Sequence, residues 1–166
     1  MGPIEEPEVP VYARLGELGI AYERFEHPPI ATADAAGEHW TAIDAVHCKN
    51  LFLRNQKGNR YYLVIVEHTK RADLRRVADQ IGDGKLSFAS PDRLMTLLSV
   101  TPGSVSPFGL IHDRERQVHV FLDRALASAT RISFHPNINT RTIVLAFADF
   151  ERFLIAEGYQ ARYIEA

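Results

Sequence analysis

Residues 46–66 read VHCKNLFLRNQKGNRYYLVIV, two apolar runs separated by a polar turn. The runs Cys48–Arg54 and Tyr61–Val66 are typical of strands, and Gln56-Lys57-Gly58-Asn59 is typical of a hairpin turn. The unbroken LVIV sequence predicts a strand that is buried on both faces. We therefore expect a β-hairpin whose second strand lies inside the core.

The rest of the chain alternates between strand and helix patterns. Further strands are expected at Tyr22–Glu26, Lys85–Phe88, Gln117–Leu122, Arg131–Phe134, Thr142–Phe147 and Ala161–Ile164. Apolar spacing and capping signals predict helices over Pro10–Leu18, Thr32–Ala36 (with Gly37 ending it), Arg71–Ile81, Pro91–Leu98 and Asp149–Glu157. Because strands occur in adjacent pairs as well as between helices, we expect an α/β (α+β-like) fold with a mixed, largely antiparallel sheet flanked by helices.

Composition and length favour one soluble globular domain over residues 1–166. The chain has 166 residues, of which 46% are hydrophobic and 24% charged, and residues 1–8 are expected to form a flexible acidic lead. No apolar run approaches the ~20 residues of a membrane helix, and the N-terminus lacks the basic and apolar regions of a secretory signal. A single cysteine excludes an internal disulfide and fits a reducing compartment. We therefore expect a cytoplasmic protein that does not contact membranes.

Metal and phosphate-loop motifs are missing from the sequence. None of the seven histidines is three or four residues from another, so no helical ligand pair exists. Gly82-Asp83-Gly84-Lys85 lacks the spacing of a phosphate-binding loop and is better explained as a helix stop. Cys48 directly follows His47, and neighbours on a strand point to opposite faces, so this histidine could not activate that thiol. We expect no metal, no cofactor and a structural cysteine.

Lys49 is unusual because it lies at the start of a strand that should enter the core. A lysine is costly to bury without a partner, so it must reach solvent, a partner or a ligand. One interpretation is an edge lysine whose charged end extends into water. The other is an ammonium at the rim of a cleft that binds an anionic or carbonyl oxygen.

Two further segments combine rigidity with polar groups. Residues 101–109, TPGSVSPFG, contain two prolines, two glycines and two serines, so this loop has a stiff backbone that can approach a ligand closely. The segment Phe134-His135-Pro136-Asn137 ends a strand and would present His135 there. An ordinary connecting loop and a structural histidine are the alternative explanations.

Basic residues gather around the hairpin turn and along one predicted helix. A solvated helix face would explain them, and so would contact with an RNA backbone. The net charge of −2 argues against indiscriminate coating of nucleic acid, and we expect no DNA partner. The residues are Arg54, Lys57, Arg60, Lys70, Arg71, Arg75 and Arg76.

The motifs VHCKNL at 46–51, Gly103-x-x-x-Pro107 and Phe134-His135-Pro136 resemble the YbaK/prolyl-tRNA-synthetase-associated editing superfamily. The longer stretches KNLFLRN, YYLV, SPFGL and FHPNINTRT are similar to its free-standing prolyl-tRNA editing branch. The resemblance extends from about Tyr12 to Leu154 and implies a mixed, partly closed sheet flanked by helices. This chain has Asn50 where many members have threonine, so the resemblance defines the reaction more closely than the amino acid removed.

The resemblance implies a deacylase that hydrolyses mischarged tRNA, with alanyl-tRNA(Pro) the expected substrate. The ester is already activated, so a positioned water suffices if the oxyanion is stabilised by main-chain N–H groups. The expected partners are the acceptor end of proline tRNA, contacted by the basic residues above, and prolyl-tRNA synthetase. The expected catalytic residues are Lys49, Gly103, Ser104 and His135, and the expected substrate contacts are Thr32, Asn50, Val105, Ser106 and Pro107.

Two other classes of function stay open at this point. A binding module of the same fold would hold tRNA, or dock on a synthetase, without hydrolysis. A deacylase for another residue, such as cysteine, or a small-molecule ester hydrolase would use the same site on a different substrate.

Overall fold

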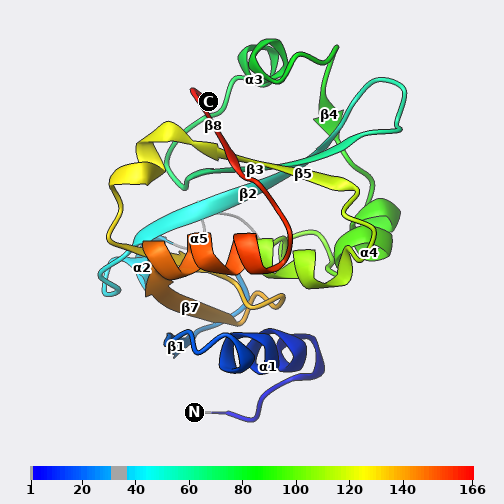
Figure 1. The fold of residues 1–166 in the computed structure, drawn as a ribbon. Coiled ribbons are helices and arrows are strands. Elements are labelled where there is room, and N and C mark those ends of the chain that lie inside the picture. The colour runs from blue at the N-terminus through cyan, green and yellow to red at the C-terminus, as the bar shows by residue number, and fades with distance from the viewer. Residues whose placement is uncertain (1, 31–36) are drawn as a thin grey trace.

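The computed structural model describes residues 2–30 and 37–166, and its strands form a mixed sheet (Figure 1). The strand order is β1-β7-β6-β2-β3-β5-β8, and β4 pairs with β2 beside this path. Strand β2 is antiparallel to β3 and parallel to β6. The strands are β1 (Glu23–Glu26), β2 (Val46–Arg54), β3 (Tyr61–Glu67), β4 (Ser87–Phe88), β5 (Val118–Asp123), β6 (Arg131–Phe134), β7 (Arg141–Ala146) and β8 (Arg162–Ile164).

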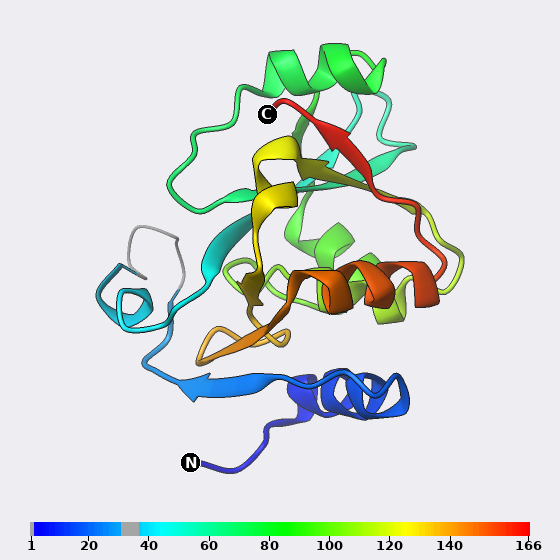
Figure 2. The ribbon, with the colours of Figure 1, turned by 60° about the vertical axis from the view of Figure 1, so that its left-hand side comes forward.

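Helices lie on both sides of the sheet, as predicted. Helix α5 lies between the β3–β5 part of the sheet and the β7–β1 part, whereas α3 lies on the other side (Figures 1 and 2). We expected a partly closed sheet; in the described residues β1 and β8 are its two edges, so the sheet is open and curves around α5. The α-helices are α1 (Val9–Glu17), α2 (Gly37–Trp40), α3 (Leu74–Ile81), α4 (Pro91–Leu98) and α5 (Phe147–Ala156), and 3₁₀ helices span Glu6–Glu8, Pro107–His112 and Arg124–Ser128.

The predicted β2–β3 hairpin is confirmed, and β3 is buried on both faces. Its turn is closed by Asn55, whose Oδ1 accepts hydrogen bonds from the main-chain N–H groups of the last two turn residues at 3.0 and 3.2 Å. On β3, Leu63 and Ile65 pack into a core shared with α1, α4 and α5. Val64 and Val66 point the other way, into a second core that includes side chains of α3.

Local capping decides where two of the helices begin and end. Asp73 accepts hydrogen bonds from two N–H groups of the first turn of α3, so this helix begins at Leu74 and not at Arg71 as predicted. Gly82, with φ of 81°, ends it, which confirms that the GDGK stretch is a helix stop. The boundaries of α4 match the prediction, and Ser90 caps it.

The segment before β2 differs from the prediction where it can be compared. Thr32 and the helix expected up to Ala36 lie outside the described residues. Gly37 begins helix α2, whereas we expected it to end a helix. None of the helices in the described ranges has the length and apolar character that a membrane span requires.

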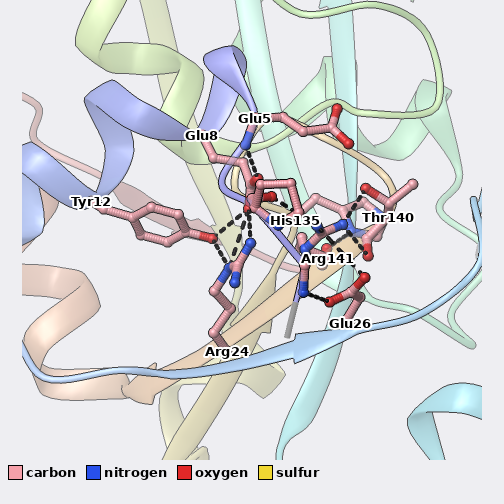
Figure 3. A network of polar contacts seen from close by, with 10 residues as sticks. Glu5, Glu8, Tyr12, Arg24, Glu26, His135, Thr140 and Arg141 are labelled. Atoms are coloured by element: carbon pink, nitrogen blue, oxygen red, sulfur yellow. Dashed lines mark hydrogen bonds and ion pairs between the residues drawn. The ribbon is translucent and has the colours of Figure 1, made fainter.

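A buried carboxylate ties the N-terminal residues to α1 and β1 (Figure 3). Glu8 is fully buried, accepts a hydrogen bond from the Tyr12 hydroxyl at 2.7 Å and lies 3.3 Å from the Arg24 guanidinium. The Gly2 N–H donates to Glu26 at 2.7 Å. These contacts link Gly2 and Glu8 to β1, and the flexibility expected of residues 1–8 stays a prediction.

The core around α5 yields a stability prediction. Phe150 is fully buried, with its ring 4.6 Å from that of Phe134. Phe150→Ala should lower the free energy of unfolding by about 3–5 kcal/mol, because it leaves a cavity. Ile155→Ala, on the same helix at a side chain that is 73% exposed, should change it by less than about 0.5 kcal/mol. Urea denaturation of both variants checks this, and equal effects would contradict it.

Candidate active site at the open edge of β2

The parallel pairing of β2 with β6 places Lys49 near His135. Val46 pairs with Ile132 and His47 with Ser133, and both segments continue in the same direction. Lys49 and His135 each lie two residues beyond the last pair, and residues two apart on a strand share a face. The register therefore brings these two predicted residues to one part of the sheet.

Strand β2 lacks a strand partner along the middle of one edge. Its other edge is paired with β3 from Cys48 to Arg54. On the open edge, the described pairing covers only residues 46–47, with β6, and residues 53–54, with β4. The Phe52 carbonyl accepts a hydrogen bond from the Ala89 N–H at 2.9 Å. The main chain of residues 48–51 therefore forms a gap between β6 and β4.

Lys49 is half-buried in this gap, and its side chain has no hydrogen bond or ion pair within the described parts of the chain. Its backbone pairs with Val66, whose side chain lies in the core beneath α3. A half-buried ammonium without a counter-ion is costly, and an anionic ligand would offset that cost. The geometry fits the anion-binding interpretation of Lys49.

Trp40 covers His47 on the same face as Lys49. The two rings are stacked, with centroids 4.7 Å apart, and His68 meets Trp40 edge-on at 5.1 Å. Nε2 of His47 lies 3.1 and 3.2 Å from the carbonyl oxygens of Trp40 and Ile43, so it carries the proton and donates. Nδ1 accepts from the Ser133 hydroxyl at 2.5 Å. Burial lowers the pKa of His47, so this ring is neutral at pH 7.

His135 is neutral and keeps one ring nitrogen free. Its Nδ1 lies 2.8 Å from the carbonyl oxygen of Arg141, so Nδ1–H donates there (Figure 3). Burial lowers the pKa of His135 to about 4. The Arg141 side chain is held by the Thr140 hydroxyl at 2.9 Å, the Pro3 carbonyl at 3.2 Å and the Glu26 carboxylate at 3.7 Å. Nε2 of His135 has no hydrogen bond to any described residue, so it remains available as an acceptor.

Buried polar atoms of two asparagine side chains in these segments lack hydrogen-bond partners in the described structure. Asn137, 4% exposed and with φ of 65°, has neither Nδ2 nor Oδ1 bonded in the described structure. Asn50 Oδ1 is also buried without a partner there. Buried polar atoms are almost always bonded, so orphaned ones mark a place that a ligand or ordered water completes. Asn50 was predicted as a substrate contact; Asn137 was not.

The loop at residues 103–107 is rigid. Some of its groups are already used within the loop, whereas others have no hydrogen-bond partner among the described residues. Gly103 has φ of 88°. The Ser104 N–H is used by a bond to the Thr101 carbonyl at 3.0 Å, and the fully buried Ser106 hydroxyl caps the following 3₁₀ helix. Pro107 is buried and has no N–H. The main-chain N–H groups that have no acceptor among the described residues are those of Gly103, Val105 and Ser106.

The loop packs on the face opposite to Lys49. Phe108, just after the loop, meets Phe134 edge-on at 5.9 Å, within the core that contains Cys48 and Phe52. Asn50 lies midway between those two β2 residues, so it shares their face. The Asn50 side chain therefore lies on the face of the sheet that the loop covers, and the Lys49 side chain lies on the opposite face, with His47.

Cys48 is a structural residue in the core, as predicted. It is buried and lies on the opposite face of β2 from His47. Burial raises the pKa of its thiol far above the usual range, so the thiolate nucleophile is absent at neutral pH.

The predicted RNA-contacting cations have different environments. Lys70 lies 2.8 Å from Asp123, which is fully buried, so this lysine neutralises an internal carboxylate. Arg54 donates to the carbonyl groups of Asn55 and Gln56 and braces the hairpin turn. The exposed cations that have no ion pair with described residues are Lys57, Arg60, Arg71, Arg75 and Arg76.

Sequence reasoning missed Trp40, His47 and Asn137. His47, His68 and His135 lie far apart in the sequence and are brought together only by the pairing of β2 with β3 and β6. No sequence spacing could therefore indicate this cluster. Within residues 2–30 and 37–166, no group of three or more potential ligand residues is arranged to hold a metal ion.

Comparison with known proteins identifies the class. Residues 27–153 match the aminoacyl-tRNA editing domain family. This match covers most of the chain, and the chain belongs to that family. The superfamily resemblance of the three sequence motifs is thereby confirmed.

Individual relatives extend over nearly the whole chain. It is 41% identical over 159 residues to the prolyl-tRNA editing protein ProX of Acetoanaerobium sticklandii, covering 93% of this chain and 94% of that protein. It is 34% identical over 150 residues to the mouse prolyl-tRNA synthetase associated domain-containing protein 1, covering 88% of each. A solved structure described as a candidate trans-editing enzyme for prolyl tRNA synthetase has the same fold, with a TM-score of 0.75, 21% identity and 99% coverage of both chains.

One buried and two half-buried histidines predict a loss of stability in acid. The pKa values of His27, His47 and His135 are lowered by burial, so below about pH 6.5 the unfolded chain takes up protons that the folded chain does not. The free energy of unfolding should therefore fall as the pH drops from about 6.5 towards 4. His135→Asn, which keeps a donor for the Arg141 carbonyl, should flatten this dependence.

Urea denaturation at several pH values measures it, with His119→Asn at an exposed position as the matched control. An unchanged pH dependence in the His135 variant would contradict the assignment of a buried, neutral ring.

Proposed function

We propose that this protein acts in trans as a deacylase that hydrolyses the ester bond of alanyl-tRNA(Pro). Family membership and the relatives named for prolyl-tRNA editing support the proposal. The observation that carries it is the gap in the pairing of β2, where Lys49 and Asn50 point to opposite faces beside His135 and Asn137. The partners are the acceptor end of proline tRNA and prolyl-tRNA synthetase.

Lys49 would bind a phosphate at the 3′ end of the tRNA. Its ammonium is without a counter-ion among described residues, and it lies at an edge that a nucleotide can approach. A compact cation suits a phosphate oxygen as a point charge. Substrate binding would then replace a half-exposed, unpaired charge by an ion pair and fix the position of the terminal ester.

The loop at residues 103–107 would stabilise the oxyanion. When water attacks the ester carbonyl, negative charge develops on the carbonyl oxygen, and preorganised N–H donors lower the energy of that state. The unpaired N–H groups of Gly103, Val105 and Ser106 are the available donors, and the Ser104 N–H is not one of them. The C–O bond to the ribose then breaks, releasing alanine and the tRNA.

His135 would orient the substrate and not act as a general base. A ring with a pKa near 4 binds a proton weakly at neutral pH, so it is a poor acceptor for the proton of the attacking water. Its free Nε2 can instead accept a hydrogen bond from the amino group of the substrate. Proton transfer is left to solvent or to the neighbouring ribose hydroxyl.

Size exclusion explains why alanine would be removed and proline kept. A synthetase pocket shaped for proline rejects the smaller alanine weakly, because a missing methylene is worth only ~1–3 kcal/mol. A second, smaller hydrolytic site would exclude proline because the pyrrolidine ring of proline is too large to enter it. The orphaned amides of Asn50 and Asn137 would bind the polar groups of the small amino acid.

The role of Lys49 predicts the effect of its removal. Lys49→Ala should reduce deacylation of alanyl-tRNA(Pro) roughly 100-fold, the loss typical of one positioned electrostatic group. Lys85→Ala, at an exposed lysine, should retain the wild-type rate. Single-turnover deacylation with radiolabelled alanine measures both, and full activity of the Lys49 variant would disprove the anchoring role.

The choice of substrate is tested by a panel of three esters. Alanyl-, cysteinyl- and prolyl-tRNA(Pro) are incubated with the enzyme at equal concentration, and alanyl-tRNA should be hydrolysed fastest and prolyl-tRNA at the spontaneous rate. Faster hydrolysis of cysteinyl-tRNA would reassign the substrate. Binding of all three without hydrolysis would make the protein a binding module.

A further inference from the structure

A cavity of about 590 Å³ lies at one end of the sheet, away from the gap in β2. Besides Ile81 of α3, three separate segments line it: the end of the β2–β3 hairpin, β5 with the turn before it, and the chain leading into β8. These segments can be followed in Figure 1. Each contributes an exposed arginine, namely Arg60, Arg116 and Arg162. His119 and Gln160 add polar groups to the lining.

The protein neutralises the positive charge of this cavity only in part. No carboxylate belongs to its lining, and within the described residues the three arginines form no ion pair. Glu157 is paired with Arg14 at 2.5 Å. Asp83 accepts a hydrogen bond from the Tyr62 hydroxyl at 2.5 Å, and this bond, together with the nearby charge of Arg60, lowers the pKa of Asp83. An anion entering the cavity would therefore meet three guanidinium groups, with Asp83 as a competing carboxylate beside Arg60.

Arg116 is held in place before any ligand binds. The buried carboxylate of Asp113 accepts hydrogen bonds from two N–H groups of the turn and from the Tyr159 hydroxyl, at 2.8 to 3.0 Å. Arg116 lies in the left-handed region, with φ of 52°, and its Nε donates to the Glu157 carbonyl at 2.8 Å. Gly158 makes this position possible, since a Cβ there would lie 2.2 Å from the Arg116 Nε.

We propose that this cavity binds the phosphate backbone of the tRNA substrate, at a distance from the ester. One guanidinium group can donate two parallel hydrogen bonds to a phosphate. Three guanidinium groups on separate segments therefore match successive phosphodiesters better than they match one small anion. Lys49 pairs with Val66, whereas Tyr62 in the cavity pairs with Leu53 and His119. Val66 and Tyr62 are four residues apart on β3, so the cavity is displaced from Lys49 by ~13 Å along the strands. It is also displaced by about two strand spacings, ~10 Å, across the sheet.

The identity of the RNA rests on the proposed function, but the site itself can be tested without catalysis. Binding of uncharged tRNA(Pro) is measured at several salt concentrations for the wild type and for the double variant Arg60→Glu/Arg162→Glu. The double variant should bind at least tenfold more weakly at low salt. Its slope of log Kd against log salt concentration should be smaller by about one for each lost phosphate contact. Arg93→Glu, an exposed arginine on α4 outside the cavity, should match the wild type.

Two further measurements separate this site from the active site. Hydrolysis of an alanyl ester of adenosine, which lacks the RNA body, should proceed at the wild-type rate in the double variant. A thermal melt, together with the milder Arg162→Gln variant, separates loss of charge from loss of folding, and the milder variant should show a smaller loss of affinity in the same direction.

The proposal is overturned if the double variant binds tRNA with the affinity and salt slope of the Arg93 control. It is also overturned if the double variant loses binding of inorganic phosphate alone while its affinity for tRNA is unchanged, since the cavity would then be a small-anion site. If the double variant loses tRNA binding as expected but the wild type does not deacylate alanyl-tRNA(Pro), the proposed function is contradicted and the binding site is still supported.

Discussion

Strand β2 is fully paired with β3 on one edge but is paired only near its two ends on the other, and the site depends on this asymmetry. The continuous ladder with β3 holds β2 rigidly inside two cores. The interrupted ladder, with β6 at residues 46–47 and β4 at residues 53–54, leaves main chain open between them. A rigid strand with an open edge can therefore present side chains to a ligand on both faces without losing its position.

The surroundings of this gap favour neutral groups over charged ones. Three histidines there have pKa values lowered by burial, and each donates a ring N–H to a main-chain carbonyl oxygen. Neutral imidazoles bind through single hydrogen bonds and do not compete with Lys49 for an anion. Near this gap the Arg141 guanidinium lies 3.7 Å from Glu26, whereas the Lys49 ammonium has no ion pair with a described residue. Three further arginines share the cavity at the far end of the sheet.

Local sequence patterns were sufficient for most elements of the fold. The hairpin, α4 and β6 were predicted to within a residue or two, because turn residues, an N-cap serine and alternating apolar residues act over short distances. The start of α3 was predicted three residues early, since Asp73 was counted as helix and not as its cap. The edges of the sheet could not be predicted, because strand order depends on contacts between segments far apart in the chain.

The sequence by itself determined the chemistry available to this protein: one lysine in a strand entering the core, a stiff glycine- and proline-containing loop, a histidine at a strand end and a cysteine too buried to react. These follow from side-chain properties and the nearest neighbours along the chain. Only the tertiary structure decided that β6 runs parallel to β2, that Asn50 Oδ1 and the Asn137 amide are buried without partners in the described structure, and that three distant arginines share a cavity. Such features arise because packing brings together residues whose separation in sequence carries no information about their distance in space.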